Sequence, residues 1–219
     1  MIDNSSQSDE PLLRVEELVA GYAGPIVGPV SFAIQPGEVI GLGGRNGAGK
    51  STLLKAITGA ARVFSGRIHR CAGLTVTHHQ QRPELPPELP LLGRELLRVM
   101  HADRQDAPDM IQPLLDRPIN RMSGGQFQLL EAWACLGGDA ELVLLDEPTN
   151  NLDGRAVDAL TQFIQASRPP RAVVLVSHEQ EFLEENCSRH IILDEDRHVA
   201  IPAAEDSSQV TQGRTGTHT

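Results

Sequence analysis

The distribution of apolar residues predicts short strands that are buried on both faces. Residues 39–42, 142–145 and 172–176 form apolar runs that lack the alternation of a half-exposed strand, which is typical of inner strands in a parallel sheet. Between the last two runs, five apolar residues recur at helical spacing and predict a crossover helix. These five are Ala156, Val157, Leu160, Phe163 and Ile164. The pattern therefore predicts an α/β fold built on a mostly parallel, doubly wound sheet.

Two other stretches follow different patterns. From residue 12 to residue 38, short alternating apolar segments are interrupted by glycines and prolines, which predicts an N-terminal antiparallel β subdomain. Residues 83–90 are rich in proline, and residues 91–101 and 108–115 then carry helical patterns. We expect a small helical subdomain inserted at about residues 83–135.

The two ends of the chain hold almost no apolar periodicity. Residues 1–11 and 203–219 are rich in Ser, Asp, Glu, Gln, Thr and Gly, so we expect tails that carry no chemistry. Residues 12–202 are predicted to form a single domain.

Composition and charge narrow the classes of function. The 219 residues include 19 Lys and Arg against 29 Asp and Glu, a net charge of −10, which would repel phosphate backbones, so we expect no nucleic-acid partner. No run of eighteen apolar residues occurs and the N-terminus is polar and acidic, which predicts neither a membrane span nor a secretory signal. Cys71, Cys135 and Cys187 lack CxxC spacing and are interpreted as buried thiols in a reducing cytosol.

A glycine-rich loop follows the first buried strand. Residues 44–51 read GRNGAGKS and fit the pattern GxxxxGK[ST], and a helix is expected from Lys50 to about Thr58, ended by Gly59. Backbone N–H groups of such a loop surround an anion, Lys50 reaches the outer phosphates, and the Ser51 hydroxyl ligates Mg²⁺. We therefore expect a nucleoside triphosphate as the ligand.

Two adjacent carboxylates follow the second buried strand. Asp146 and Glu147 stand at its carboxyl end, the edge at which α/β sheets bind ligands. Because neighbouring residues of a strand point to opposite sides, we expect Asp146 to hold Mg²⁺ and Glu147 to polarise the water that attacks the γ-phosphate. His178 follows the third buried strand and is expected to contact the γ-phosphate from the same edge.

A motif shortly before the carboxylates gives a family resemblance. Residues 122–126 read MSGGQ, which resembles the LSGGQ signature of the ATP-binding cassette (ABC) family, with Met122 in place of leucine. The DEPT sequence that begins with the two carboxylates, the NLD triplet at residues 151–153 and His178 extend the resemblance over about residues 13–201. It implies a P-loop NTPase (RecA-like) fold, ATP and Mg²⁺ as cofactors, and ATP hydrolysis.

The resemblance assigns roles to individual residues. The residues that it implies for catalysis are Lys50, Glu147 and His178. The Mg²⁺ ligands that it implies are Ser51, Gln80 and Asp146. The residues that it implies for nucleotide binding are Tyr22 (the aromatic residue that stacks on adenine), Gly44, Asn46, Gly47, Gly49, Lys50, Ser51, Thr52, Ser123, Gly124, Gly125, Gln126 and Asp153.

One of these assignments has an alternative, because the loop glutamine is either Gln80 or Gln81. Counting from strand to loop favours Gln80. The preceding residues, His78 and His79, have no third metal ligand nearby in the sequence and are interpreted as solvated loop residues.

In the family two cassettes meet head to tail, so that the signature of one covers the γ-phosphate held by the other. Here Ser123 precedes an expected helix at residues 126–136, whose N-terminus would attract an anion. The positions in that helix that are spaced for burial are Phe127, Leu130 and Ala134. Leu129 and Trp133 stand where the family commonly has arginine, which makes surface pairing there doubtful. We expect a second cassette as partner, with a homodimer favoured and a homologous partner as the alternative.

The length of the helical insertion limits the classes of ABC protein that the chain resembles. It is too short for the large inserts of ABC proteins in chromosome maintenance, and one cassette is present where translation factors of the family carry two. We therefore expect an ATP-binding subunit of an ABC transporter, cytoplasmic and peripheral on the inner face of the cell membrane, docked on a separate transmembrane permease subunit.

Within the transporters, residues 89–98 resemble ATPases of zinc and manganese import. Residues 149–153 and 177–183 resemble the translation-factor branch equally well. A soluble cassette that acts on the ribosome or another cytosolic machine is therefore the alternative, and the cargo, its direction and the permease stay open.

Overall fold

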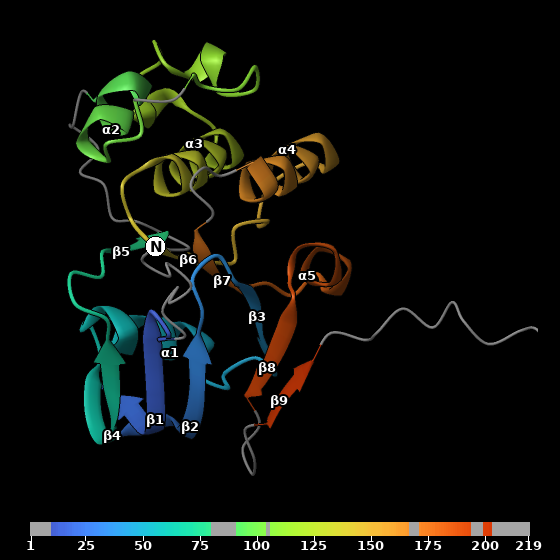
Figure 1. Cartoon of the computed structure of the whole chain (residues 1–219). Coiled ribbons are helices and arrows are strands. Elements are labelled where there is room, and N and C mark those ends of the chain that lie inside the picture. The colour runs from blue at the N-terminus through green and yellow to red at the C-terminus, as the bar shows by residue number, and fades with distance from the viewer. Residues whose placement is uncertain (1–9, 80–90, 104–105, 167–170, 194–198, 203–219) are drawn as a thin grey trace, which may run out of the picture.

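The computed structural model describes residues 10–79, 91–103, 106–166, 171–193 and 199–202. In these ranges the chain forms two sheets with helices packed between and beside them (Figure 1). The larger sheet has the strand order β5-β6-β7-β3-β8-β9, and all of its strands are parallel except β9. The strands are β3 (Val39–Gly44), β5 (Val76–His79), β6 (Leu142–Asp146), β7 (Ala172–Val176), β8 (Arg189–Leu193) and β9 (Val199–Pro202). The predicted mostly parallel sheet is confirmed.

The smaller sheet is antiparallel and has the order β2-β1-β4. It consists of β1 (Leu13–Gly21), β2 (Pro25–Ile34) and β4 (Arg62–Arg70). The N-terminal antiparallel unit is therefore confirmed, and β4 is a strand that the sequence pattern did not indicate. Its residues are mostly exposed, so it lacks the apolar alternation by which a half-buried strand is recognised.

The parallel sheet separates two hydrophobic cores. On one face, Leu144 and Val174 pack with α1 (Lys50–Thr58) and the smaller sheet. On the other face, Val143 and Leu175 pack with α3 (Gly124–Gly137), α4 (Gly154–Ala166) and α5 (Gln180–Asn186). Successive side chains of a strand alternate between the faces, and both faces are covered, which is why the apolar runs in β6 and β7 do not alternate.

The helical insertion contains less helix than its sequence pattern predicts. The expected helix at residues 91–101 is the shorter α2 (Gly93–Val99), and the expected helix at residues 108–115 is wrong, because only the 3₁₀ turn η1 (Gln112–Leu114) forms there. Pro113 explains the second difference, since its ring lacks an N–H and would clash with the carbonyl of residue 109 in an α-helix. A second 3₁₀ turn, η2 (Ile119–Arg121), leads into the signature.

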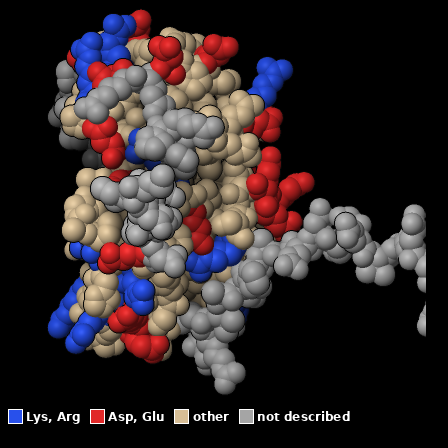
Figure 2. All heavy atoms as spheres, viewed as in Figure 1, with Lys and Arg blue, Asp and Glu red and all other residues tan. Residues whose placement is uncertain are grey.

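Within the described ranges, the structure contains no helix with the length and apolarity needed to cross a membrane. Acidic and basic side chains are interspersed on the face shown in Figure 2. Cys135 and Cys187 are buried as expected, and burial raises the pKa of each to about 12. Cys71 is only partly buried, which corrects that part of the expectation.

Candidate active site

The glycine-rich loop joins β3 to α1, and the helix begins at Lys50 as predicted and ends at Gly59. Gly49 has a φ of 90°, and a Cβ atom there would lie 2.6 Å from the Cβ of Val27 in β2. Only glycine therefore allows the loop to turn into α1 while packed against the smaller sheet. The first N–H groups of α1 have no partners within the helix and give its start a positive potential.

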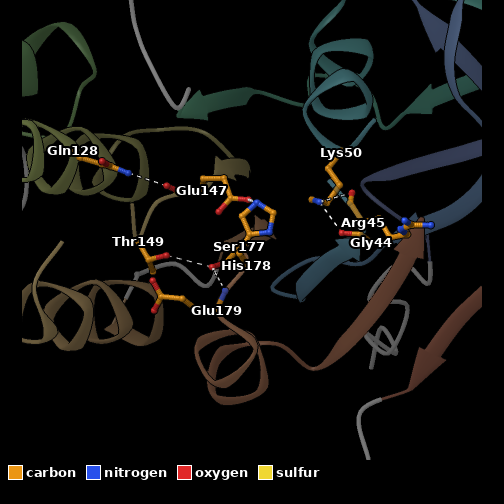
Figure 3. Close-up of polar contacts among 9 residues, drawn as sticks. All are labelled: Gly44, Arg45, Lys50, Gln128, Glu147, Thr149, Ser177, His178 and Glu179. Carbon is orange, nitrogen blue, oxygen red and sulfur yellow. Dashed lines mark hydrogen bonds and ion pairs between the residues drawn. The ribbon is translucent and has the colours of Figure 1, made fainter. Parts of the chain in front are cut away.

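The side chain of Lys50 lies across the loop. Its Nζ donates hydrogen bonds to the carbonyl oxygens of Gly44 at 2.8 Å and Arg45 at 3.1 Å (Figure 3). The residue is 7% exposed, so the ammonium group is held in a defined position at the start of the helix.

The two carboxylates lie at the end of β6, as expected. The direction of the Glu147 side chain, however, has a different cause from the expected one. The strand ends at Asp146, and Glu147 has a φ of 52° in the left-handed region. Strand alternation therefore does not set the direction of the Glu147 side chain; a left-handed turn does. Asp146 Oδ1 and Glu147 Oε2 are both buried without a hydrogen-bond partner among the described residues. Burial raises the pKa of Glu147 above its ordinary value.

His178 lies opposite Glu147 at the end of the neighbouring strand β7 (Figure 3). Its Nε2 is 2.9 Å from Glu147 Oε1, and its side chain is 54% exposed whereas that of Glu147 is 6% exposed. The loops that carry the two residues are also joined, because the hydroxyls of Thr149 and Ser177 lie 3.3 Å apart and Ser177 Oγ accepts a hydrogen bond from the N–H of Glu179. The imidazole therefore bridges the buried carboxylate and solvent.

These groups face one cavity of about 330 Å³. The expected site residues that line it are Asn46, Gly47, Gly49, Lys50, Ser51, Thr52, Glu147 and His178. Asp146 lies buried close to it, and the Gly44 carbonyl contacts Lys50. Tyr22 does not line this cavity; it is 47% exposed, with Lys55 Nζ 6.0 Å from the centre of its ring. Gln80 and Gln81 lie outside the described residues.

The signature residues surround a second cavity, of about 410 Å³. The expected site residues that line it are Ser123, Gly125, Gln126 and Asp153. Ser123 caps α3: its Oγ accepts from the Gln126 N–H at 3.2 Å, and Gln126 Oε1 accepts from the Ser123 N–H at 3.1 Å, which is a capping box. A Cβ atom on Gly125 would lie 2.4 Å from the carbonyl oxygen of Asn151, so glycine allows α3 to approach this loop. Gly124 has open space around its Cα.

The sequence matches the family model described as ABC transporter over residues 27–150. The chain belongs to the ABC transporter family of ATPases. The zinc import ATP-binding protein ZnuC of Paracoccus denitrificans is 35% identical over 179 residues, which cover 77% of this chain and 70% of that protein.

Solved structures of ABC proteins share the fold. The structure of an ATP binding subunit of an ABC transporter superposes with a TM-score of 0.73 at 25% identity, over 87% of this chain and 90% of that one. A chain in the complex of an archaeal ribosomal stalk protein with an archaeal ribosome recycling factor superposes with a TM-score of 0.72 at 27% identity, over 84% of this chain and 37% of that one.

ABC ATPases bind ATP, usually with Mg²⁺, and the groups at the first cavity of this ABC protein fit both. Asp146 has a buried oxygen without a hydrogen-bond partner among the described residues, and Ser51 lines the cavity; hard oxygen ligands of this kind suit Mg²⁺. The ammonium group of Lys50 and the start of α1 supply the positive charge that phosphates require.

Sequence reasoning missed Gln128. Its side chain is buried and its Nε2 donates to the carbonyl oxygen of Glu147 at 2.8 Å (Figure 3). The available signal was a polar residue next to the apolar residues of a mostly apolar helix, since an amide that is buried there requires hydrogen-bond partners.

One expectation about neighbouring residues is corrected, and a second is supported. His79 is not a solvated loop residue; it ends β5 and is fully buried, with Nε2 3.5 Å from Glu131 Oε2. Leu129 and Trp133 are buried, which supports the interpretation that their replacement of arginine disfavours surface pairing, and the Trp133 ring packs edge-on against Phe163 of α4 with the ring centres 5.0 Å apart. These residues of α3 join it to the core.

Proposed function

We propose that this chain is the ATP-hydrolysing subunit of an ABC importer of zinc. The observation that best supports hydrolysis is the position of the buried Glu147 carboxylate. Its Oε1 lies 2.9 Å from His178 Nε2, and the residue lines the same cavity as Lys50. The likeness to ZnuC supports zinc as the cargo.

In this proposal, Lys50 and the first N–H groups of α1 bind the phosphates of ATP, together with the backbone of Gly44, Asn46, Gly47 and Gly49. The hydroxyl of Ser51 and the carboxylate of Asp146, with Gln80, would hold Mg²⁺, and Thr52 lines the same cavity as Ser51. When bound there, Mg²⁺ would supply positive charge that offsets the charge of the phosphates. Tyr22 lies exposed beside Lys55, where its ring is available to stack on adenine.

Glu147 accepts a proton from the attacking water. Its raised pKa, caused by burial, makes it a stronger base than a solvated carboxylate. The His178 Nε2–H donates to Glu147 Oε1 and keeps the other oxygen free to face the water. Because the imidazole is half exposed on the side of the cavity, it also contacts the γ-phosphate.

The proposed protein partners are inferred from the presence of two cavities that are lined by different residues. Ser123, Gly124, Gly125, Gln126 and Asp153 would face ATP bound by a second copy of this chain, and a transmembrane permease would hold the pair at the inner face of the membrane. The same permease would carry the metal ion.

The experiment is a comparison of Mg²⁺-dependent ATP hydrolysis by the purified full chain and its Glu147→Gln variant. We expect kcat to fall about 100-fold or more, which is the usual contribution of a general base. Glu185→Gln is the matched control, because Glu185 is exposed on α5, and it should keep the wild-type rate. A Glu147→Gln variant with more than half of the wild-type kcat would overturn the proposal.

The likeness to the ribosome recycling factor structure supports a second candidate, a cassette that acts on the ribosome. Capture of partners by tagged Glu147→Gln with ATP, from detergent-solubilised cells, separates the two. A multi-spanning membrane protein supports the importer, and restoration of growth by added zinc, but not manganese, in cells that lack this chain supports zinc. Recovery of ribosomal proteins alone supports the second candidate.

A further inference from the structure

A buried side chain joins the signature helix to the backbone of Glu147. Gln128 lies in the second turn of α3, and its Nε2 donates to the Glu147 carbonyl oxygen over 2.8 Å (Figure 3). Gln128 is 7% exposed and Glu147 is 5% exposed. Since water has little access to this bond, its loss cannot be compensated as it would be on the surface.

The bond acts on an unusual piece of backbone. Glu147 has a φ of 52°, a left-handed conformation that is unfavourable for a residue with a Cβ atom. Such a conformation persists only where the surrounding structure holds it. The Glu147 N–H donates to the Val176 carbonyl oxygen of β7 at 2.8 Å, and the Glu147 carbonyl oxygen accepts from Gln128 and, at 3.2 Å, from the N–H of Asn150.

The backbone conformation decides where the carboxylate points. A left-handed residue directs its Cβ to a different side than a strand residue does, and here that side places Oε1 at 2.9 Å from His178 Nε2. The bond to Val176 holds the peptide group before Glu147, and Gln128 holds the one after it from another element. Without Gln128, the Asn150 N–H, which lies in the same turn, is the remaining described donor to that carbonyl.

We propose that Gln128 is a positioning residue for ATP hydrolysis, which holds the left-handed backbone of Glu147 and thereby aims its carboxylate. This inference rests on the proposed function of Glu147. It also gives a mechanical link, because Gln128 follows the capped Ser123 end of the same helix. The hydrogen bond therefore connects the helix that begins at the signature with the backbone of Glu147.

The test is the Gln128→Met variant of the full chain, which keeps the side-chain length and removes the donor. We expect kcat for ATP to fall at least 10-fold while KM for ATP stays within 2-fold, since Gln128 does not line the nucleotide cavity. In the Glu147→Gln background the same substitution should lower the residual rate by less than 2-fold, because the group that it positions has already been removed.

Gln112→Met is the matched control. The Gln112 side chain is exposed and also donates from Nε2 to a carbonyl oxygen, that of Ala107, at 2.8 Å. This variant should keep kcat and KM within 2-fold of the wild type. If Gln128→Met does not fold, Gln128→Asn replaces it; this variant keeps the amide but is one methylene too short, and the same loss of kcat is expected.

Three results would overturn the inference. They are a Gln128 variant with more than half of the wild-type kcat, a fall in kcat that is matched by Gln112→Met, and a rise in KM that accounts for the loss. Each of these leaves the proposed function intact as long as Glu147→Gln abolishes hydrolysis. A wild-type chain without Mg²⁺-dependent hydrolysis would instead overturn the proposed function, and this inference with it.

Discussion

A buried imidazole and a largely buried carboxyl lie side by side between β5 and α3. His79 is fully buried, and its Nε2 is 3.5 Å from Glu131 Oε2. Burial lowers the pKa of His79 to about 4 and raises the pKa of Glu131 to about 7, because a poorly solvated site disfavours the charged form of each group. Between these two values both side chains are neutral, which is the state in which they are buried at least cost.

The carboxyl of this pair makes stability depend on pH. The pKa of Glu131 is higher in the folded state than its ordinary value of 4.5, so the folded state binds this proton more strongly than the unfolded state does. The stability that the bound proton contributes is therefore lost as pH rises from 4.5 through about 7. Glutamine stays neutral, so Glu131→Gln should raise the free energy of unfolding by about 2 kcal/mol more at pH 8 than at pH 5. Urea unfolding at both pH values measures this difference.

The exposed Glu185 supplies the control, since Glu185→Gln should shift stability equally at the two pH values. His79 acts in the opposite sense, because its lowered pKa makes the folded state more stable as pH rises from about 4 to 6.5. Since pH 5 lies inside that window and pH 8 above it, the contribution of His79 differs between the two pH values, but it is present in both the wild type and Glu131→Gln and cancels in their difference. Equal effects of Glu131→Gln at pH 5 and pH 8 would contradict the raised pKa.

At the scale of elements, the C-terminal end of α3 is held by the residue that precedes β7. The guanidinium group of Arg171 donates to the carbonyl oxygens of Leu136, Gly138 and Ala140, and the residue is 7% exposed. The last carbonyl groups of a helix have no partners within it. Arg171 therefore satisfies one of them, that of Leu136, together with two carbonyl groups just beyond the helix, and joins the signature helix to the parallel sheet.

Removal of this cap should destabilise the chain. Arg171→Met keeps much of the apolar stem but leaves buried carbonyl groups without donors, so we expect the free energy of unfolding to fall by about 3 kcal/mol. Urea unfolding measures the loss. Arg155 is exposed on α4, and Arg155→Met should change stability by less than about 0.5 kcal/mol; equal effects of the two substitutions would contradict the capping role.

At the scale of the whole molecule, the expected site residues divide between two cavities. Lys50, Glu147 and His178 line the first, while Ser123, Gly125 and Asp153 line the second. Neither cavity holds all the groups that the ABC resemblance implies around one nucleotide. In the proposed function, a complete site would therefore form where the first cavity of one chain meets the second cavity of another.

This division predicts a dimer that depends on ATP. Glu147→Gln should bind ATP without hydrolysing it, and the bound nucleotide should hold two chains together. Size-exclusion chromatography should show a dimer with saturating ATP and Mg²⁺ and a monomer with ADP. Lys50→Ala in the same background should remain monomeric, because it removes the phosphate contact. A Glu147→Gln variant that stays monomeric with ATP would contradict a composite site between two copies of this chain.

The features that the sequence predicted correctly are local ones. The helix at residues 50–58 agrees with α1 at both ends, because the glycine-rich loop and Gly59 set these ends by backbone conformation alone. The apolar run at residues 172–176 agrees with β7, because an uninterrupted run of apolar side chains directly indicates a strand that is buried on both faces. The order of carboxylates and His178 along one edge follows from parallel strands ending on the same side of a sheet.

The sequence by itself determined the fold class, the family and the local motifs, each of which depends on residues close together in the chain. Features that depend on contacts between distant segments of the chain were decided only by the tertiary structure. The left-handed backbone of Glu147 is held by Val176 and Gln128, and the burial of His79 depends on α3, whose Glu131 lies beside it. The exposed segment β4 forms a strand because its backbone pairs with that of β1. Hydrogen bonds and burial between segments far apart in the chain have no local pattern, so only the folded chain shows them.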